Sequence, residues 1–283
     1  PERLSIGLCS LRQNEDILTF AAVFDMSPEG KVLKEWFGRT IIHSDRRFAY
    51  EDAQERIESA EGDLADELVQ LNKLALELRK KRFQTGAVNF ETTEVKFKLD
   101  ENGKPLGVIP KVRKDAHKLI EEFMLLANKQ VATFIFNMKQ GKEKNTFVYR
   151  THDFPDPEKV NTFATFARRF GHEIKVDDAS ISKSFNKLLS TIEGKPEENV
   201  LQQLAIRAMA KAKYTTEPIG HFGLAFAHYT HFTSPIRRYP DMMVHRLLQH
   251  YLDQGKSVEK EAFEKKCEHS SEREKRAAEA ERA

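Results

Sequence analysis

Apolar and polar positions alternate in the first part of the chain and recur at helical spacing through most of the remainder. Residues 1–45 have a β-type pattern, with strand-like runs at 17–24 and 32–42 joined by Ser27-Pro28-Glu29-Gly30, which fits a type I turn. A second hairpin is predicted around Asn102-Gly103. Helical spacing indicates helices at 51–60, 63–82, 115–138, 183–192, 199–212 and 257–283. The pattern predicts a mixed α/β (α+β) fold.

The helix at 115–138 is apolar almost all round, so we expect it to be buried. Glu121 and Glu122 then need partners, because an unpaired buried carboxylate is costly. Glu121, Leu125 and Asn128 lie at i, i+4 and i+7, which places a carboxylate and an amide on one stripe that could face a polar channel. The alternative is a structural salt bridge with one of the many basic residues.

The stretch 227–248, AHYTHFTSPIRRYPDMMVHRLL, has the most unusual local pattern of the chain. Ser234 suits an N-cap and Pro235 suits the first helical position, so Arg237 and Arg238 are expected in the first turn of a helix. Free N–H groups at that end favour an anion, and two arginines there indicate a phosphate site. A break is expected at Pro240, where a second helix starts. The alternative is that both arginines pair with carboxylates inside an ordinary fold.

The segment 229–248 resembles the signature of the ribonuclease II / ribonuclease R family, whose catalytic part is the RNB domain. EEFMLLAN at 121–128 and the opening run 3–11 also resemble family segments. The resemblance covers essentially the whole chain but only part of the family's catalytic domain. It implies that residues 1–283 are part of one RNB catalytic domain, a β-sheet core surrounded by helices that is incomplete at its N-terminal side.

The resemblance also implies an activity. The intact protein is expected to be a 3′-to-5′ exoribonuclease of the bacterial ribonuclease R type, hydrolysing single-stranded RNA to nucleoside 5′-monophosphates with Mg²⁺ by a two-metal mechanism. We further expect a cytoplasmic protein that is a monomer.

Three residues are implied to hold the terminal nucleotides of RNA. Tyr50 matches a tyrosine that helps to hold the 3′ end, and Phe90 lies where the family has an aromatic residue that stacks on bases. Glu121 matches a glutamate that recognises ribose hydroxyls, which would help to select RNA over DNA. From the residues alone, a tyrosine such as Tyr50 is more often half-buried packing, and Phe90 would be assigned to the core.

Two further positions complete the predicted site. Arg237, helped by Arg238, is expected to contact the scissile phosphate and is the catalytic candidate, because it can stabilise developing negative charge. Glu281 aligns loosely with a family glutamate near the RNA path.

The family binds its metal ions with an aspartate cluster of the form D-x5-D-x-D-D, and this chain has no match to it. The adjacent aspartates Asp177 and Asp178 are preceded by Lys175 and Arg169 where further aspartates are required. We therefore predict no metal ligand in the chain. Both chain ends look like cuts in a longer protein, so we expect the cluster and the flanking OB-fold domains to have been removed.

Two rival functions come from other classes. A phosphoesterase with its own metal site would use imidazole and carboxylate ligands, which suit transition metals. The candidates for that site are His221, His228, His231, Asp241 and His245. The other rival is a non-catalytic RNA-binding module.

Composition limits the possible classes of function but does not choose among them. Lysine and arginine number 46 against 44 acidic residues, a net charge of +2, so any RNA site must come from local clustering. Cys9 and Cys267 lack metal-site spacing and indicate reduced thiols. No apolar run is long enough to span a membrane, and no signal peptide is visible.

Overall fold

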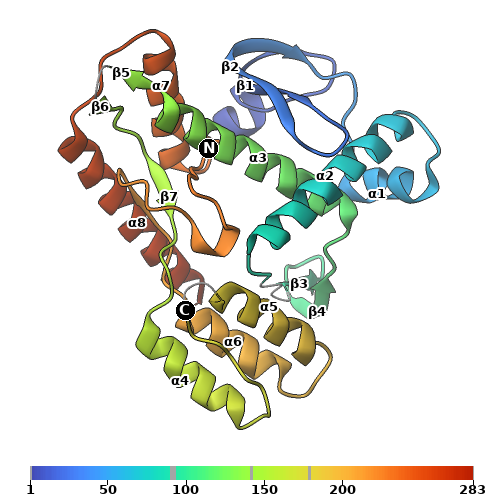
Figure 1. The fold of residues 1–283 in the computed structure, drawn as a ribbon. Helices are drawn as coiled ribbons and strands as arrows, with labels where there is room; N and C mark the ends of the chain where they lie inside the picture. Colours follow the sequence, from blue (N-terminus) through green and yellow to red (C-terminus); the bar gives the residue numbers. More distant parts are fainter. Residues whose placement is uncertain (1, 90–93, 141–142, 178–179, 283) are drawn as a thin grey trace.

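The computed structural model describes residues 2–89, 94–140, 143–177 and 180–282, and its described part is a mixture of helices and short antiparallel strand pairs (Figure 1). The strands are β1 (Asp16–Met26), β2 (Val32–His43), β3 (Glu94–Leu99), β4 (Pro105–Lys111), β5 (Lys139–Gln140), β6 (Glu143–Lys144), β7 (Tyr149–Thr151) and β8 (Lys213–Thr215). The helices are α1 (Tyr50–Ser59), α2 (Ala65–Thr85), α3 (Asp115–Asn137), α4 (Pro157–Arg168), α5 (Ile181–Ile192), α6 (Glu198–Ala208), α7 (Tyr239–Leu252) and α8 (Lys260–Arg282), with the single turn η2 (Phe222–Leu224). The mixed α/β class is confirmed.

The expected β-sheet core is where this architecture differs from the prediction. The described strands form four two-stranded sheets, β1-β2, β3-β4, β5-β6 and β7-β8, rather than one central sheet. Buried helices, α3 and α7 among them, supply much of the core. The pattern at residues 1–45 was also partly misread, since Arg3–Leu8 forms the short π-helix η1 instead of β structure.

Both predicted hairpins form. In β1-β2 the chain reverses at Ser27-Pro28-Glu29-Gly30, where the Gly30 N–H donates to the Ser27 carbonyl over 2.8 Å and Gly30 has φ 71°. In β3-β4 the Gly103 N–H donates to the Asp100 carbonyl over 3.0 Å, and Gly103 has φ 79°. Glycine adopts this left-handed region without the steric cost that a Cβ brings, which is why the local sequence was sufficient.

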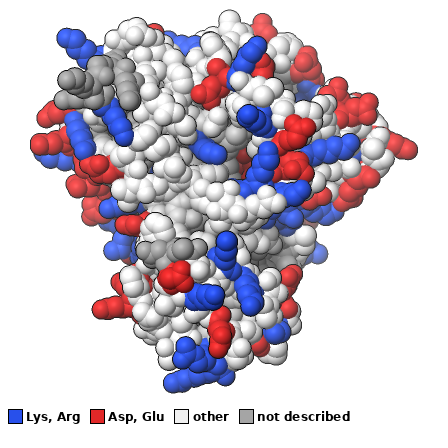
Figure 2. Space-filling model, in the orientation of Figure 1, with Lys and Arg blue, Asp and Glu red and all other residues white. Residues whose placement is uncertain are grey.

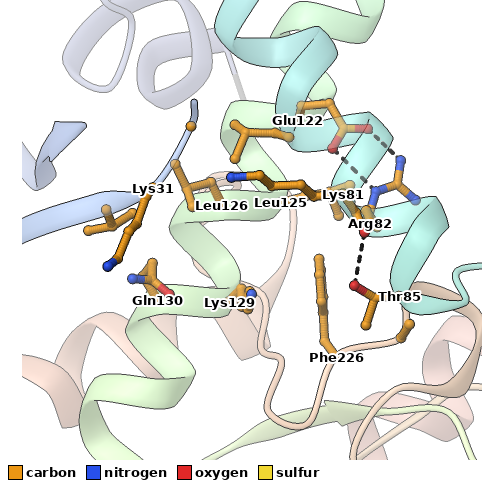
Figure 3. A pocket seen from close by; sticks show the side chains of 14 residues that line it. Lys31, Lys81, Arg82, Thr85, Glu122, Leu125, Leu126, Lys129, Gln130 and Phe226 are labelled. Carbon is orange, nitrogen blue, oxygen red and sulfur yellow. Dashed lines mark hydrogen bonds and ion pairs between the residues drawn. The ribbon is translucent and has the colours of Figure 1, made fainter. Parts of the chain in front are cut away.

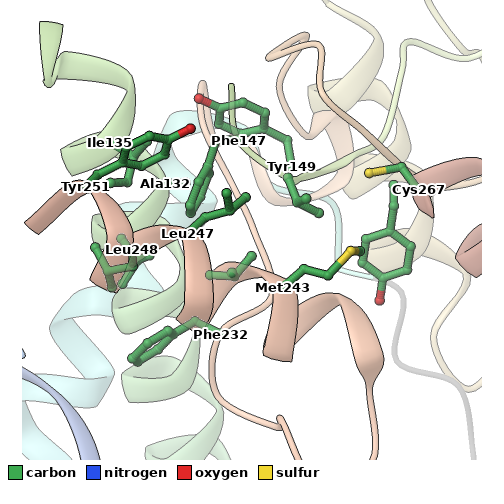
Figure 4. Close-up of a cluster of buried hydrophobic side chains, with 14 of the residues drawn as sticks. Ala132, Ile135, Phe147, Tyr149, Phe232, Met243, Leu247, Leu248, Tyr251 and Cys267 are labelled. Carbon is green, nitrogen blue, oxygen red and sulfur yellow. The ribbon is translucent and has the colours of Figure 1, made fainter. Parts of the chain in front are cut away.

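The larger hydrophobic cluster surrounds α3 and α7 (Figure 4). Val131 and Ile135 of α3 and Leu248 and Tyr251 of α7 have no exposed surface. The prediction that α3 is buried holds for its C-terminal half only, because Ile120 and Met124 in its N-terminal half are 43% and 39% exposed. One side of α3 is therefore open near its N-terminal half, where Glu121 lies.

A second hydrophobic cluster holds α4, α5 and α6 together in the lower part of Figure 1. Asp156 caps α4 by accepting the Glu158 N–H over 2.9 Å, and Pro157 takes the first helical position, where no backbone donor is needed. Phe163 of α4 stacks on Phe185 of α5 with ring centroids 5.7 Å apart. This group of helices thus has a core of its own.

Helix α8 is mainly a surface helix that packs on one side, as predicted. Its Glu264 accepts the Thr215 hydroxyl over 2.8 Å and the Thr216 N–H over 2.6 Å, and Cys267 is fully buried. Both cysteines are free thiols, with Cys9 exposed. Within the described residues, no helix is long and apolar enough to cross a membrane.

Candidate nucleic-acid interface

The two arginines lie in a loop that precedes α7, and we call residues 229–238 the arginine loop. The N–H groups of Arg237 and Arg238 donate to the Ser234 carbonyl over 3.3 and 3.1 Å, which closes a single turn. The predicted first helix is not formed, because only this single turn exists at residues 235–237, whereas the predicted break at Pro240 agrees with the structure. The second predicted helix is confirmed: α7 begins at Tyr239 with Pro240 in its first turn.

Arg238 is fixed by a buried carboxylate. Asp241 has no exposed surface, and its Oδ1 accepts the Ser234 N–H over 2.7 Å and Arg238 Nη2 over 2.8 Å. Arg238 Nε lies 2.8 Å from Asp241 Oδ2, although the N–H does not point along that line. Of the two arginines, Arg238 therefore follows the alternative prediction, in which the arginine pairs with a carboxylate of the fold. Arg237 is exposed, and its guanidinium makes no hydrogen bond or ion pair to any described residue.

Asn128 of α3 attaches the arginine loop to the core. Its buried side-chain oxygen accepts the N–H groups of Phe232 and Thr233 over 2.9 and 3.3 Å, and its amide donates to the Tyr229 hydroxyl over 3.1 Å. The sequence marked Asn128 as a polar residue on an apolar helix but gave no sign of this partner. Glu121 lies about two helical turns away on the same stripe, roughly 10 Å along the axis.

Two largely buried histidines, one of them within the arginine loop, are uncharged. His231 Nδ1 lies 2.8 Å from the Tyr214 hydroxyl, and burial lowers the pKa of His231 to about 2, with Arg238 and Arg150 adding to the shift. Burial likewise lowers the pKa of His221 to about 3. Both imidazoles are therefore uncharged at neutral pH, and the positive charge of this region belongs to the arginines.

The histidines of the rival metal site have separate partners. His245 Nε2 lies 2.7 Å from the Phe232 carbonyl, His228 stacks on Phe136 with ring centroids 3.6 Å apart, and Asp241 binds Arg238. In the described ranges, no group of three or more His, Cys, Asp or Glu side chains is arranged to hold a metal ion. The described residues of this rival site therefore do not fit a divalent cation.

The two glutamates of α3 have different environments. Glu122 is 3% exposed and is bound by Arg82, with Arg82 Nε 3.2 Å from Glu122 Oε2. Glu122 therefore forms the structural salt bridge that the sequence left open as an alternative for the two glutamates. Glu121 is 36% exposed and has looser ion pairs, 3.7 Å to Arg113 and 3.8 Å to Arg82. Of the two, Glu121 is the carboxylate that an incoming hydroxyl can reach.

Tyr50 lies near Glu121. It is the first residue of α1, is 46% exposed, and stacks on His117 of α3 with ring centroids 4.2 Å apart and planes 9° from parallel. His117 is one helical turn before Glu121. The Tyr50 ring also borders an apolar cavity of about 400 Å³ that includes Ile57 and Ile120.

The remaining predicted residues are less informative. Phe90 lies outside the described residues. Glu281 is exposed in the last turn of α8, and among the described residues it makes no hydrogen bond or ion pair with the arginine loop. The structure thus brings Arg237, Arg238 and Asn128 together, and it places Tyr50 and Glu121 at the N-terminal half of α3.

Charge is spread over the molecule in agreement with the small net charge. Figure 2 shows basic and acidic side chains interspersed on one face, densest around α1 and α2, with a pale uncharged area in the middle. A nucleic-acid site on this chain therefore depends on particular groups such as the Arg237 guanidinium rather than on a broad basic surface.

Comparison with known proteins identifies the class to which this chain belongs. The family model of the RNB domain matches residues 1–254. The chain belongs to the RNB domain family.

Relatives with the name Ribonuclease R are similar along the whole chain. The protein of that name from Aquifex aeolicus is 37% identical over 99% of the chain, and Ribonuclease R 1 from Lactococcus lactis is 38% identical over 100%. The solved structure of Mycoplasma genitalium RNase R in complex with ribose methylated single-stranded RNA matches 96% of the chain with a TM-score of 0.84 and 26% identity. The chain spans 40%, 35% and 43% of these three proteins, respectively.

Proposed function

We propose that this chain is the RNA-holding part of a 3′-to-5′ exoribonuclease that shortens single-stranded RNA and releases nucleoside 5′-monophosphates. The observation that carries the proposal is the 37–38% identity, over essentially the whole chain, to proteins named Ribonuclease R. The RNA bound to the Mycoplasma genitalium RNase R structure supports RNA as the ligand class. Cytoplasmic location and a monomeric state stay predictions.

In this proposal Arg237 binds the scissile phosphate. Its guanidinium is exposed and unpaired among the described residues, so it can present parallel N–H donors to a phosphate. Arg238 is held by Asp241 and acts mainly by setting the shape of the turn and adding positive charge. Asn128 keeps the turn against α3.

The other end of α3 would hold the sugar and base. Glu121 can accept from a ribose 2′-hydroxyl, which DNA lacks. Tyr50 offers half of its ring surface, and its stacking on His117 keeps the ring in one orientation. A base could add to this stack at little ordering cost.

Magnesium and the two-metal mechanism belong to the proposal for the whole protein only. The family's divalent ions would activate water and stabilise the leaving oxygen. The described residues provide no ligand set for them, and the chain spans 35–43% of the relatives reported above, so we propose that the metal-binding carboxylates come from another part of the whole protein.

The test is incubation of the chain with 5′-labelled single-stranded RNA and Mg²⁺, following retention on the RNA and shortening separately. We expect retention without shortening. Arg237→Ala should weaken retention about tenfold or more, since hydrogen bonds to charged groups are the strong ones. It should also lower the slope of log affinity against log salt by about 0.7, the value for one single-strand phosphate contact.

Arg168→Ala is the matched control, because Arg168 is an exposed arginine at the end of α4. It should change neither quantity. Equal losses in the two variants would mean that only general charge matters. Stepwise shortening by the chain alone would contradict the assignment of the metal ligands to residues outside it, and no retention at all would contradict RNA holding.

A further inference from the structure

A cavity of about 420 Å³ lies between the β1-β2 turn, α2, α3 and the segment before the arginine loop (Figure 3). We call it the lysine pocket. Its size is within the range of about 300–1,000 Å³ that is usual for small-molecule sites. Leu78, Leu125 and Leu126 form an apolar wall, and Phe226 adds an aromatic face.

The charges of the lysine pocket do not balance. Four cationic side chains, Lys31, Lys81, Arg82 and Lys129, line it together with one carboxylate, Glu122. Arg82 is bound by that carboxylate, which leaves three ammonium groups. Lys81 donates to the Glu29 backbone carbonyl and also lies close enough to the Glu29 carboxylate to lower its pKa, so that exposed carboxylate offsets part of the Lys81 charge. Figure 3 shows these lysines reaching the same hollow from different elements.

Lys129 is the unusual member of the set. Burial lowers the pKa of its ammonium, so the folded chain holds this charge at a cost. Its contact in the described structure is the Phe226 ring, with Nζ 5.1 Å from the ring centroid, and no described carboxylate lies within ion-pair distance of it. The neighbouring Glu35 accepts from the Gln130 amide over 3.0 Å instead. A cation placed in this way would gain from an anion in the cavity.

We propose that the lysine pocket binds the phosphate of a nucleotide. The three ammonium groups would hold the phosphate, while the leucine wall and Phe226 would receive the apolar part of a base or sugar. The choice of a nucleotide over other anions rests on the proposed function. The phosphate has two possible sources, a residue within a bound RNA strand or a free nucleoside 5′-monophosphate such as the reaction releases.

The position of the pocket fits either source. Lys129 follows Asn128 in α3, and Asn128 binds the arginine loop. Phe226 precedes Tyr229 by three residues in the same segment. The lysine pocket and the arginine loop therefore share α3 and the segment 225–238, so both lie on the same two elements.

The experiment compares Lys129→Gln with the unchanged chain and with Lys187→Gln, which removes an exposed lysine of α5. Binding of 5′-AMP is measured by titration calorimetry, and binding of a single-stranded RNA oligonucleotide by fluorescence anisotropy. Lys129→Gln should weaken at least one ligand about tenfold, while Lys187→Gln changes neither. Thermal unfolding without ligand checks folding, and Lys129→Gln should unfold at an equal or higher temperature because an unpaired buried charge is gone.

The outcomes separate the two sources. Loss of 5′-AMP binding with RNA binding retained identifies a site for the free mononucleotide. Loss of RNA binding, with 5′-AMP bound by neither protein, identifies a site for a phosphate of the strand. Equal affinities of Lys129→Gln and the unchanged chain for both ligands would overturn the proposal. A neutral result for Arg237→Ala would count against the proposed function alone and leave the lysine pocket standing.

Discussion

Arg237 and Arg238 are consecutive in the chain, but only Arg238 is fixed by a buried carboxylate. The Arg238–Asp241 pair is a structural device: removing Asp241 would leave Arg238 partly buried without a counter-charge, an arrangement that typically costs about 3–5 kcal/mol. Arg237 has no such internal partner among the described residues, which leaves its charge for a ligand. Position in the turn, rather than residue type, separates the two roles.

The pH dependence of stability tests whether the largely buried His231 imidazole stays neutral in the folded protein. Burial lowers its pKa to about 2, so on acidification the unfolded chain binds the proton and the folded chain does not. Its contribution to stability is complete above about pH 6.5 and is lost as the pH falls from there towards 2. His231→Asn should therefore reduce the pH slope of the unfolding free energy by about 1.4 kcal/mol per unit.

The measurement is urea unfolding at several pH values between 7.5 and about 4.5. Tyr214→Phe is the matched control, because it removes the hydroxyl beside His231 but keeps the buried imidazole and thus the slope. An unchanged slope in His231→Asn would mean that this imidazole takes up its proton in the folded protein.

Residue roles that depend on partners far away in the chain could not be predicted from the sequence. The carbonyl oxygen of the Asn128 side chain meets Phe232, 104 positions away, and local spacing carries no information about that pairing. The same holds for Lys129 and Phe226, which local patterns give no reason to single out. By contrast, the resemblance marked Arg237, Glu121 and Tyr50, and the structure leaves all three at least one-third exposed.

At the scale of elements, prediction succeeded where local chemistry decides. Asn102-Gly103 and Ser27-Pro28-Glu29-Gly30 specify their turns, and the helical spacing of 115–138 predicted α3 to within one residue at its end. It failed where neighbouring elements decide. The turn at Ser234 was predicted to start a helix because its capping residues are favourable, but only one turn forms, and the Ser234 N–H donates to the distant Asp241 side chain instead.

Packing of α8 against β7 and β8 makes a clear prediction for the two cysteines. Cys267 is fully buried, and burial raises the pKa of its thiol to about 12, whereas Cys9 is exposed. Because the thiolate is the reactive form, a thiol reagent at neutral pH should modify Cys9 quickly and Cys267 only when α8 detaches or the chain unfolds.

Mass spectrometry of labelled peptides over time follows both sites. Cys9→Ser supplies the control, since that variant should show no rapid labelling at all. Labelling of the two sites at similar rates would show that α8 does not pack on the sheet as described.

At the scale of the molecule, two separate hydrophobic clusters hold different groups of elements together. The cluster around α3 and α7 carries the arginine loop, the lysine pocket and the Tyr50 side, while α4, α5 and α6 have a separate core. The family resemblance predicted the mixed class, and the site residues that it implies stay a prediction. It did not predict how the strands pair, because pairing depends on contacts between segments far apart in the chain.

Hydrogen–deuterium exchange, measured with and without a single-stranded RNA oligonucleotide, can show whether RNA binds where the arginine loop meets α3. Amide exchange reports local opening, so a bound ligand slows it where it stabilises structure. We expect slower exchange in residues 229–241 and in α3 when RNA is bound. RNA that binds while these segments exchange unchanged, with protection confined to α4, α5 and α6, would contradict it.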